Sequence, residues 1–380
     1  MEISTMSHKT KILFTHNTAM WYRLPFFKKV SEIYDLDLVF THINVIKDIY
    51  DNNINKEIEG LEGVNYTILP NTHGFCKGLF KKARGNYDVV VGGSWDTVQE
   101  LIETIMLHLM TRIKNKPFII WREDWDWERE NTFKEKILNH VIKYITTHSD
   151  AILVPGTLHK EYFTKLGVLP NKIHIMPNVS NISGYDENIK RNHENKKILY
   201  VGRLIPRKGV DYLIKAYAKL KRQINNIELI IIGSGSEEDT LKEYVRDNNI
   251  DNVTFTGKID NNQLKNYYQQ SNLVVIPSIN EGMGDPWVFV LNEAMYYGNP
   301  VIATTAVGAA PDMIEDNGFI VPEKNSDELY SAMYQILSDD TTEEIMGKNS
   351  RMIIENKFQY SNMVNAFTKT IESVINNYIL

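Results

Sequence analysis

Two carboxylates between Ser278 and Pro311 have the types and spacing that could bind a sugar nucleotide. Asp285 and Glu293 are separated by seven residues, with a turn rich in glycine and proline around the first acid and a helix start at the second. Backbone amides at a helix N-terminus favour anions, and carboxylates accept hydrogen bonds from sugar hydroxyls. The pair therefore indicates a sugar-nucleotide site, and two solvated acids at a bend are the alternative interpretation.

Three cations form a second group with a chemical role. Arg203, Arg207 and Lys208 follow a buried-strand pattern at 198–201 and precede an amphipathic helix pattern at 210–220. Because open parallel sheets bind ligands at the carboxyl ends of their strands, we expect these cations at a ligand crevice. Arginine offers a bidentate fork and lysine a point charge, and together they can neutralise a diphosphate. For Arg207, a solvated loop charge is the alternative.

Taken together, these two segments resemble the retaining glycosyltransferases of family 4, which have the GT-B fold. The acid pair is similar to the acid-x7-acid signature of that family, and residues 202–209 are similar to its Gly-Arg-Leu, spacer, Lys-Gly pattern. The resemblance covers about residues 196–322. It implies that Glu293 holds the nucleotide ribose, that the first acid lies against the transferred sugar, and that Arg203 and Lys208 bind the donor diphosphate.

The first acid has two candidates. Glu281 is twelve positions before Glu293, too far for the motif, whereas Asp285 has the family spacing and stands in place of Glu in the family pattern Glu-Pro-Trp-Gly. We therefore expect Asp285 to align the sugar and to be catalytic together with Arg203 and Lys208. The resemblance also implies donor contacts from several loop and motif positions, which are Gly202, Gly233, Gly257, Lys258, Pro286, Trp287 and Val288, the last in place of the family's glycine.

The acceptor side departs from the commoner family pattern. Many relatives have a glycine-rich loop after the first strand and a His at the end of a middle strand, and here residues 16–23 and 121–127 take these places. Glu123 or Asp124 could act as the acceptor's base, and Trp125 could stack on a sugar face. Solvated acids and a core tryptophan are the alternative. The expected acceptor-side residues are Asn17, Tyr22, Arg23, Gly93, Asp124 and Trp125, with Glu123 as a catalytic candidate.

Strand and helix patterns alternate through both halves of the chain, which predicts doubly wound parallel sheets. In the first half the strand patterns are at 11–15, 36–41, 87–91, 118–121 and 151–154. With the resemblance, we expect an α/β protein of two Rossmann-like domains and a ligand cleft between them. The expected units are an acceptor-side domain at 1–185, a nucleotide-sugar-binding domain at 186–360, and a helix at 361–380 that packs back toward the N-terminal domain.

Composition narrows the class of protein. A chain of 380 residues with 43% apolar and 24% charged residues is globular and exceeds the usual size of one core. Cys76 is the only cysteine, so we expect no disulfide within the chain and no cysteine-based metal site. The ten His residues are scattered, so we expect no metal. A net charge of −6 argues against a nucleic-acid partner.

We expect a cytoplasmic protein, because the chain has no apolar run of membrane-spanning length and its start lacks the apolar core of a signal peptide. One segment could still meet a membrane. Its basic and aromatic residues could rest on an anionic surface at the inner membrane face, and a solvated loop is the alternative. These residues are Phe75, Lys77, Leu79, Phe80, Lys81, Lys82 and Arg84.

The resemblance implies a retaining glycosyltransferase that moves a sugar, typically a hexose, from a UDP or GDP donor to a hydroxyl of a saccharide or a lipid-linked acceptor. Cell-surface polysaccharide or glycolipid synthesis would be its setting, and no cofactor is expected. Two other functions share these motifs: a catalytically silent subunit that binds sugar nucleotides, and a GT-B epimerase. Turnover of candidate donors would distinguish the enzyme from the silent subunit.

Overall fold

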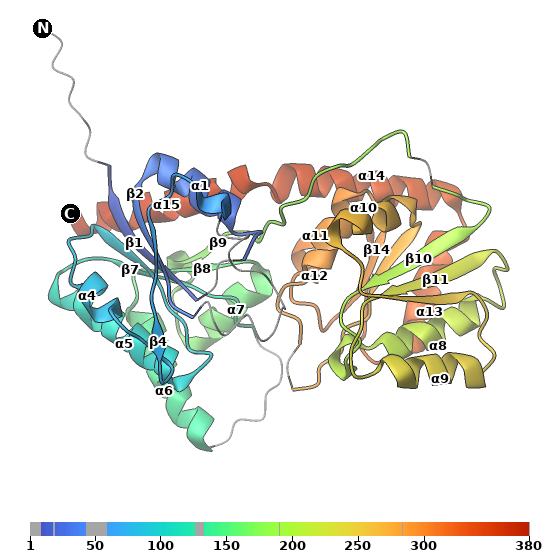
Figure 1. Cartoon of the computed structure of the whole chain (residues 1–380), viewed down its shortest axis with the longest axis horizontal. Coiled ribbons are helices and arrows are strands. Elements are labelled where there is room, and N and C mark those ends of the chain that lie inside the picture. The colour runs from blue at the N-terminus through green and yellow to red at the C-terminus, as the bar shows by residue number, and fades with distance from the viewer. Residues whose placement is uncertain are drawn as a thin grey trace, which may run out of the picture.

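The computed structural model of the chain has two α/β domains side by side, as Figure 1 shows. It describes residues 9–17, 20–42, 59–125, 133–189, 191–282 and 284–379. Within these ranges no helix has both the length and the apolar character needed to cross a bilayer.

The first domain is built on a parallel sheet of seven strands in the order β3-β2-β1-β6-β7-β8-β9. Strands β6, β7 and β8 are buried along their whole length, in keeping with their apolar sequences. The strand order reverses next to β1, so the crevice beyond the carboxyl ends of β1 and β6 is a switch point suited to ligands. The strands are β1 (Lys11–His16), β2 (Asp35–Phe40), β3 (Tyr66–Ile68), β6 (Val89–Gly92), β7 (Phe118–Trp121), β8 (Ala151–Val154) and β9 (Ile173–Ile175).

Helices and a short antiparallel hairpin, β4 with β5, accompany this sheet. Helix α5 begins with a capping box, in which the Thr97 hydroxyl accepts from the Glu100 amide and the Glu100 carboxylate accepts from the Thr97 amide. This reciprocal pair fixes the first turn of α5 and the direction of its side chains. The elements are α1 (Leu24–Ile33), β4 (Asn71–Thr72), β5 (Phe75–Cys76), α4 (Leu79–Ala83), α5 (Val98–Ile113), α6 (Phe133–His148) and α7 (Thr157–Leu166), with 3-10 turns at Glu59–Leu61 and Pro170–Lys172.

The second domain has a parallel sheet of six strands in the order β12-β11-β10-β13-β14-β15. Its strands are β10 (Lys196–Val201), β11 (Ile227–Ile232), β12 (Val253–Gly257), β13 (Leu273–Ile276), β14 (Val301–Thr304) and β15 (Gly318–Val321). Its helices are α8 (Val210–Leu220), α9 (Glu238–Asp247), α10 (Asn261–Gln270), α11 (Phe289–Tyr296), α12 (Ala310–Met313), α13 (Ser326–Leu337) and α14 (Asp340–Lys357), with a 3-10 turn at Pro206–Lys208. The two sheets confirm the predicted α/β class with two Rossmann-like domains.

The chain passes between the domains twice. The first passage is the segment 176–195, whose described residues form no helix or strand. The second leads from α14 into α15 (Tyr360–Ile379), which lies along the first domain in Figure 1. There the Phe367 ring packs 5.8 Å from Phe14 and 5.5 Å from Phe26, between ring centroids. The Tyr360 hydroxyl also donates to the Tyr22 carbonyl at 2.6 Å.

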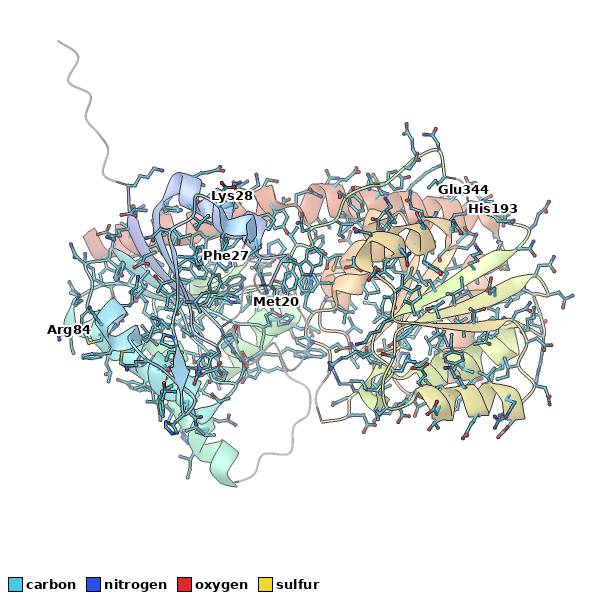
Figure 2. All side chains as sticks on the ribbon, viewed as in Figure 1. Met20, Phe27, Lys28, Arg84, His193 and Glu344 are labelled. Atoms are coloured by element: carbon cyan, nitrogen blue, oxygen red, sulfur yellow. The ribbon has the colours of Figure 1, made fainter. Side chains whose placement is uncertain are left out.

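The basic and aromatic segment forms β5, α4 and the turns beside them. Phe75 and Phe80 expose 42% and 54% of their surface, and the Lys82 ammonium pairs with Asp37 at 2.9 Å. Arg84, labelled in Figure 2, lies at the end of the first domain that is remote from the second. The segment therefore presents two apolar rings on the outside of the molecule.

Candidate functional site

Asp285 is the centre of an ionic cluster between the loops that follow β10 and β13 in the second domain. Asp285 exposes 4% of its surface. The Lys208 ammonium donates to Asp285 Oδ2 at 2.6 Å, and the Arg207 guanidinium pairs with Oδ1. The Ser278 hydroxyl also donates to Oδ2. The loops after β10 and β13 thus meet through one carboxylate.

Backbone contacts hold this cluster in place. Gly209 follows the two cations with φ of +59°, and a Cβ there would lie 2.1 Å from the Pro277 carbonyl, so the turn requires glycine. The Ile279 amide donates to the Arg207 carbonyl at 2.9 Å. The backbone amide of Asp285 donates to the Ala306 carbonyl at 3.0 Å, and the backbone carbonyl of Asp285 accepts from the Gly308 amide at 2.8 Å. The carboxylate and the cations are therefore pre-positioned by three loops.

In this cluster the opposite charges keep one another ionised despite burial. Burial raises the pKa of Asp285, but Lys208 and Arg207 outweigh burial and bring the pKa below its ordinary value, so the carboxylate is ionised. Burial lowers the pKa of Lys208, and the attraction of Asp285 opposes that effect. Two cations facing one carboxylate leave a surplus positive charge, which suits an incoming anion such as a diphosphate.

Arg203 lies apart from this ionic cluster. Its side chain is exposed, and it has no hydrogen bond or ion pair within the described residues, while its carbonyl accepts from the buried Tyr200 hydroxyl at 2.8 Å. The structure instead pairs Arg207 with Asp285, so Arg207 is not a solvated loop charge. Glu281 is also outside the cluster: its side chain is half exposed and lies 3.9 Å from the Lys324 ammonium.

Glu293 lies on α11 and is half-buried. The Tyr268 hydroxyl donates to Glu293 Oε2 at 2.7 Å, and the Tyr268 ring stacks on Tyr297 with centroids 5.6 Å apart. Burial raises the pKa of Glu293 to about 7, with the Tyr268 hydrogen bond opposing the rise. The group therefore changes charge near neutral pH, which is typical of residues at functional sites.

Three glycines of the expected donor site lie in neighbouring loops at the carboxyl edge of the sheet. Gly233 has φ of +137°, and a Cβ there would lie 1.8 Å from the Gly202 carbonyl, so the loops after β10 and β11 are in direct backbone contact. The Gly233 amide donates to the Gly257 carbonyl at 2.9 Å. Lys258 is exposed beside them. The edge thus offers backbone groups to a ligand.

The three residues after Asp285 are mainly packing residues. The buried Trp287 indole donates to Asn292 Oδ1 at 3.0 Å, and its ring lies 6.3 Å from His159 and 6.1 Å from Phe358. Val288 is the buried N-cap residue of α11. Pro286 is half-buried, with its carbonyl against Gly308. Their side chains therefore support the acid-bearing loop, and any donor contact would come from its backbone.

On the acceptor side, Arg23 and Glu123 meet at the junction of the two domains. The buried Arg23 guanidinium donates to Asn178 Oδ1 at 2.7 Å and pairs with Glu123. The Asn178 amide nitrogen donates to Glu123 Oε1 at 2.9 Å, and the Asn178 carbonyl accepts from Asn292 of the second domain at 3.1 Å. Glu123 therefore has two fixed partners and joins a network between the domains.

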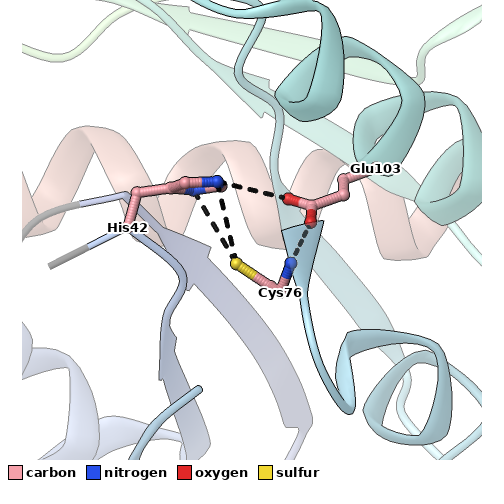
Figure 3. Close-up of side chains that lie close together, drawn as sticks. All are labelled: His42, Cys76 and Glu103. Atoms are coloured by element: carbon pink, nitrogen blue, oxygen red, sulfur yellow. Dashed lines mark hydrogen bonds and ion pairs between the residues drawn. The ribbon is translucent and has the colours of Figure 1, made fainter. Parts of the chain in front are cut away.

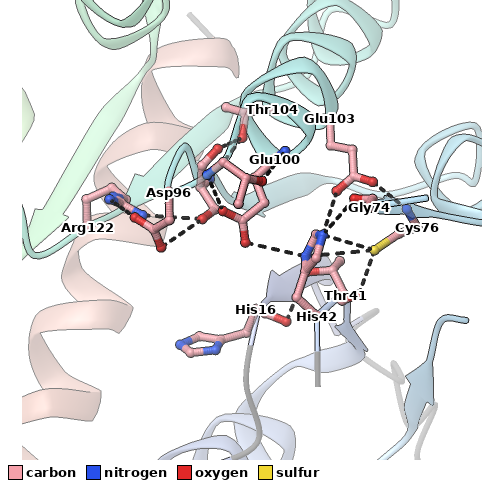
Figure 4. A network of polar contacts seen from close by, with 12 residues as sticks. His16, Thr41, His42, Gly74, Cys76, Asp96, Glu100, Glu103, Thr104 and Arg122 are labelled. Atoms are coloured by element: carbon pink, nitrogen blue, oxygen red, sulfur yellow. Dashed lines mark hydrogen bonds and ion pairs between the residues drawn. The ribbon is translucent and has the colours of Figure 1, made fainter. Parts of the chain in front are cut away.

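Asp124 belongs to a different network, shown in part in Figure 4. Arg122 donates to Asp124 at 2.6 Å and to Asp96 at 2.8 Å, and the Trp95 indole donates to Asp124 at 3.0 Å. Burial raises the pKa of Asp96, and Arg122 lowers it more, so Asp96 stays ionised. Arg122 lines a cavity of about 70 Å³ together with Thr15, His16, Asn17, Gly93 and Ser94. Two expected acceptor-side residues, Asn17 and Gly93, are thus brought together.

The aromatic acceptor candidates lie at the domain junction. Trp125 exposes 6% of its surface, its ring lies 6.5 Å from His159, and it also lies against Gly284. This burial favours the core-packing interpretation of Trp125 over stacking on a sugar. Tyr22 packs on Phe289 of the second domain with ring centroids 4.2 Å apart. The remainder of the segment that ends at residue 127 lies outside the described residues.

Sequence reasoning missed a mixed cluster of His42, Cys76, Glu100 and Glu103. The four residues are buried, and their polar atoms face one another beside the acceptor-side cavity. Burial, followed by the charge of Glu103, raises the pKa of the Cys76 thiol to about 12, so the free thiol is not a nucleophile at neutral pH. No spacing rule could find these residues, because the fold brings them together from three separate segments.

The C-terminal part of the chain is similar to a known protein family. Residues 183–352 match the family model described as Glycosyl transferases group 1. The chain is 30% identical over 241 residues to an uncharacterized glycosyltransferase of Methanocaldococcus jannaschii, covering 59% of this chain and 60% of the relative. It is 30% identical over 164 residues to the GDP-mannose-dependent alpha-(1-6)-phosphatidylinositol monomannoside mannosyltransferase of Mycobacterium tuberculosis, covering 42% of each.

Solved structures share the whole fold. Anabaena HepE in complex with UDP and glucose superposes with a TM-score of 0.69 at 17% identity, covering 96% of this chain and 100% of that chain. Sucrose-phosphate synthase from Thermosynechococcus elongatus gives a TM-score of 0.71 at 18% identity, covering 97% and 100%. At these identities the likeness concerns the fold. In sequence, the matches span 60%, 45% and 49% of the length of three curated relatives.

Proposed function

We propose that this protein transfers a sugar from a nucleoside diphosphate sugar to a hydroxyl of a saccharide or lipid-linked acceptor, because residues 183–352 match the family model described as Glycosyl transferases group 1. The observation that carries the proposal is the buried cluster of Asp285, Lys208 and Arg207 at the carboxyl edge of the second sheet. It supplies pre-positioned cations and a carboxylate at the place where such sheets bind ligands.

In the proposed donor complex, Lys208 and Arg207 neutralise the diphosphate, and the exposed Arg203 adds a further charge. Glu293 accepts hydrogen bonds from the ribose, and Asp285 contacts the sugar or the charge that develops on it. The loop glycines offer backbone amides to the nucleotide. These roles follow the residue types and positions: two of the cations are already held together by Asp285.

We propose that transfer retains the configuration of the sugar through a front-face route. The bond between the anomeric carbon and the phosphate oxygen breaks, and a bond from the acceptor oxygen forms on the same face. The acceptor proton moves to the leaving phosphate, whose negative charge the cations stabilise. Arg23 and Asn178 both hold Glu123, which supports a positioning role for Glu123 and leaves the phosphate as the base.

The donor is proposed to be a UDP or GDP hexose. HepE was solved with UDP and glucose, and the mycobacterial relative is named as GDP-mannose-dependent. Phe75 and Phe80, exposed beside basic residues, support a peripheral contact of the first domain with the inner face of a membrane. A cytoplasmic location, cell-surface glycan synthesis and the domain bounds 1–185, 186–360 and 361–380 belong to the same proposal.

A donor screen tests this function. Thermal unfolding of the protein with UDP, GDP and ADP sugars should show one nucleotide class that raises Tm. The same donor should then be transferred to an acceptor, or slowly hydrolysed, with net retention seen by NMR. Stabilisation without any turnover would favour the silent subunit, and interconversion of the donor sugar would favour the epimerase.

A further inference from the structure

His42, Cys76 and Glu103 bring three kinds of metal-binding atom together in the first domain, as Figure 3 shows. His42 follows β2, Cys76 ends β5, and Glu103 lies on α5. The Cys76 Sγ is 3.8 Å from the His42 ring nitrogens, and His42 Nε2 is 3.9 Å from Glu103 Oε2. One ligand atom from each residue lies within 4.8 Å of the others.

We propose that these three residues bind a divalent transition-metal ion of the zinc class. Thiolate, imidazole and carboxylate are the ligands that Zn²⁺ prefers, at metal distances of about 2.0–2.3 Å. A tetrahedral ion with such bonds would hold its ligand atoms roughly 3.3–3.7 Å apart. The two distances from His42, 3.8 Å to the Cys76 sulfur and 3.9 Å to the Glu103 carboxylate, therefore need to shorten by only a few tenths of an ångström.

Glu100 supplies the contact that would orient the histidine. Its Oε1 atom lies 3.5 Å from His42 Nδ1, while its Oε2 atom accepts from the Thr97 amide at 3.0 Å. The capping box thus fixes a carboxylate against Nδ1. If Nδ1–H donates to Glu100, the lone pair of Nε2 is free for the ion, which is the usual arrangement of a metal-bound histidine.

The cluster also has contacts that serve the metal-free protein. The Gly74 carbonyl lies 3.3 Å from His42 Nε2, the Thr41 carbonyl accepts from the Cys76 thiol, and Glu103 Oε1 accepts from the Cys76 amide. Metal binding would replace the first two contacts and leave the third. The amide contact keeps Glu103 beside Cys76 in either state.

Charge supports an ion at this place. Two buried carboxylates and a thiol face a single imidazole, and no lysine or arginine ion pair with either carboxylate occurs within the described ranges. Buried anionic groups without positive partners are costly, and a divalent ion would balance a thiolate and a carboxylate.

A second cluster in the molecule provides the contrast. His193, Asp340 and Glu343 also lie close together, but the Lys196 ammonium pairs with Asp340 and lies 3.4 Å from Glu343. An ammonium already supplies the positive charge there. His193, labelled in Figure 2, lies in the second domain, far from the first cluster, so it offers a matched control.

The position of the proposed ion suggests what it does. His42, Glu100 and Glu103 line the same cavity as Asn17 and Gly93, which gives the ion an entry path. An ion there would tie the end of β2, the β4–β5 hairpin and α5 to one another. We therefore infer that it stabilises the wall of the acceptor-side cavity.

The test measures metal binding rather than sugar transfer, so its failure is distinct from failure of the proposed function. The full chain is stripped with a chelator and titrated with Zn²⁺ or Co²⁺. We expect one ion per chain and a thiolate charge-transfer band with Co²⁺. Since Cys76 is the only cysteine, the charge-transfer band reports on this site alone.

Variants of the proposed site and of the control cluster show whether the ion binds at His42. His42→Gln should abolish the charge-transfer band, Glu100→Gln should weaken metal affinity by about 10–100-fold, and His193→Gln should bind the ion like the wild type. If the wild type binds no Zn²⁺ or Co²⁺, or binds Co²⁺ without a thiolate charge-transfer band, the proposal is wrong. It is also wrong if His193→Gln loses the ion while His42→Gln keeps it. The Co²⁺ titration of the wild type decides the matter even if a variant does not fold.

Discussion

The Lys208 ammonium lies 2.6 Å from Asp285 Oδ2, so the cation expected to bind phosphate and the acid expected to contact the sugar form one ion pair. Arg207 pairs with the other oxygen of the same carboxylate. An incoming diphosphate would compete with Asp285 for both cations and would release the carboxylate toward the sugar. We therefore expect donor binding and alignment of the sugar to be coupled through this pair.

Asp285 and Glu281 should differ sharply when each loses its charge. We expect Asp285→Asn to lower kcat by about 10²-fold or more without weakening the binding of free nucleotide, because the lost contact is to the sugar or to charge developing on it, and the diphosphate no longer competes with Asp285 for the cations. Glu281→Gln should do little, since Glu281 is half exposed beside Lys324. Kinetics with one donor, and calorimetry with free nucleotide, check this. The reverse result would place the first acid four residues earlier.

Removal of the phosphate-binding cations should slow the chemical step. We expect Lys208→Ala and Arg203→Ala each to lower kcat by about 10²-fold, because charge on the leaving nucleotide grows as the bond breaks. Lys208→Ala should also lower Tm, since it takes a partner from a buried carboxylate. Lys324→Ala is the control for loss of an exposed lysine nearby. Unchanged kcat in both test variants would reject these roles.

The fold could be predicted from the sequence because its strands are unbroken apolar runs. The patterns at 118–121 and 151–154 coincide with β7 and β8, and the pattern at 210–220 coincides with α8. Burial on both faces leaves such strands little alternative. Some of the expected donor-side residues could be placed in the fold for a related reason: Gly202 directly follows β10 and Gly233 directly follows β11, so the ends of these strands fix their positions.

The acceptor side could not be predicted in the same way, because its contacts join distant segments. Asn178 bridges Arg23 and Glu123, which are 155 and 55 residues away in the chain. Trp125 follows a strand, as a ligand-binding residue would, but packing against Gly284 buries it. Only tertiary structure distinguishes a buried tryptophan from one that faces a sugar.

Glu123 should prove to be a positioning residue. We expect Glu123→Gln to lower kcat by less than about tenfold, whereas loss of a general base costs about 10²–10⁴-fold. Arg23→Ala should be the more damaging change to stability, because it leaves Glu123 without its cationic partner at the domain junction. Kinetics and thermal unfolding of both variants check this. If Glu123→Gln lowered kcat by about 10²-fold with unchanged Tm, Glu123 would be the general base instead.

The stability of the ligand-free protein should respond to Glu293 in a defined direction. Its pKa is raised to about 7, above the usual value of a glutamate, so the native state binds the proton more tightly than the unfolded chain. This group therefore lowers stability as pH rises from the unfolded pKa toward 7. We expect Glu293→Gln to raise Tm by a few °C at pH 8 and to have little effect at pH 4. A lower Tm at pH 8 would contradict the assignment.

Donor binding should show the opposite response to pH, because the ribose hydroxyls need an ionised Glu293 as acceptor. With a pKa of about 7, the ionised fraction rises about tenfold between pH 6 and pH 8, and donor affinity should rise by a similar factor. A nucleotide sugar is the right ligand for this calorimetry, since its diphosphate has no terminal phosphate that titrates in this range. Glu293→Gln should bind both donor and free nucleotide more weakly and should show no such pH dependence. If the variant kept the wild-type pH profile, the titrating group would be another residue, and the ribose contact would have to be reassigned.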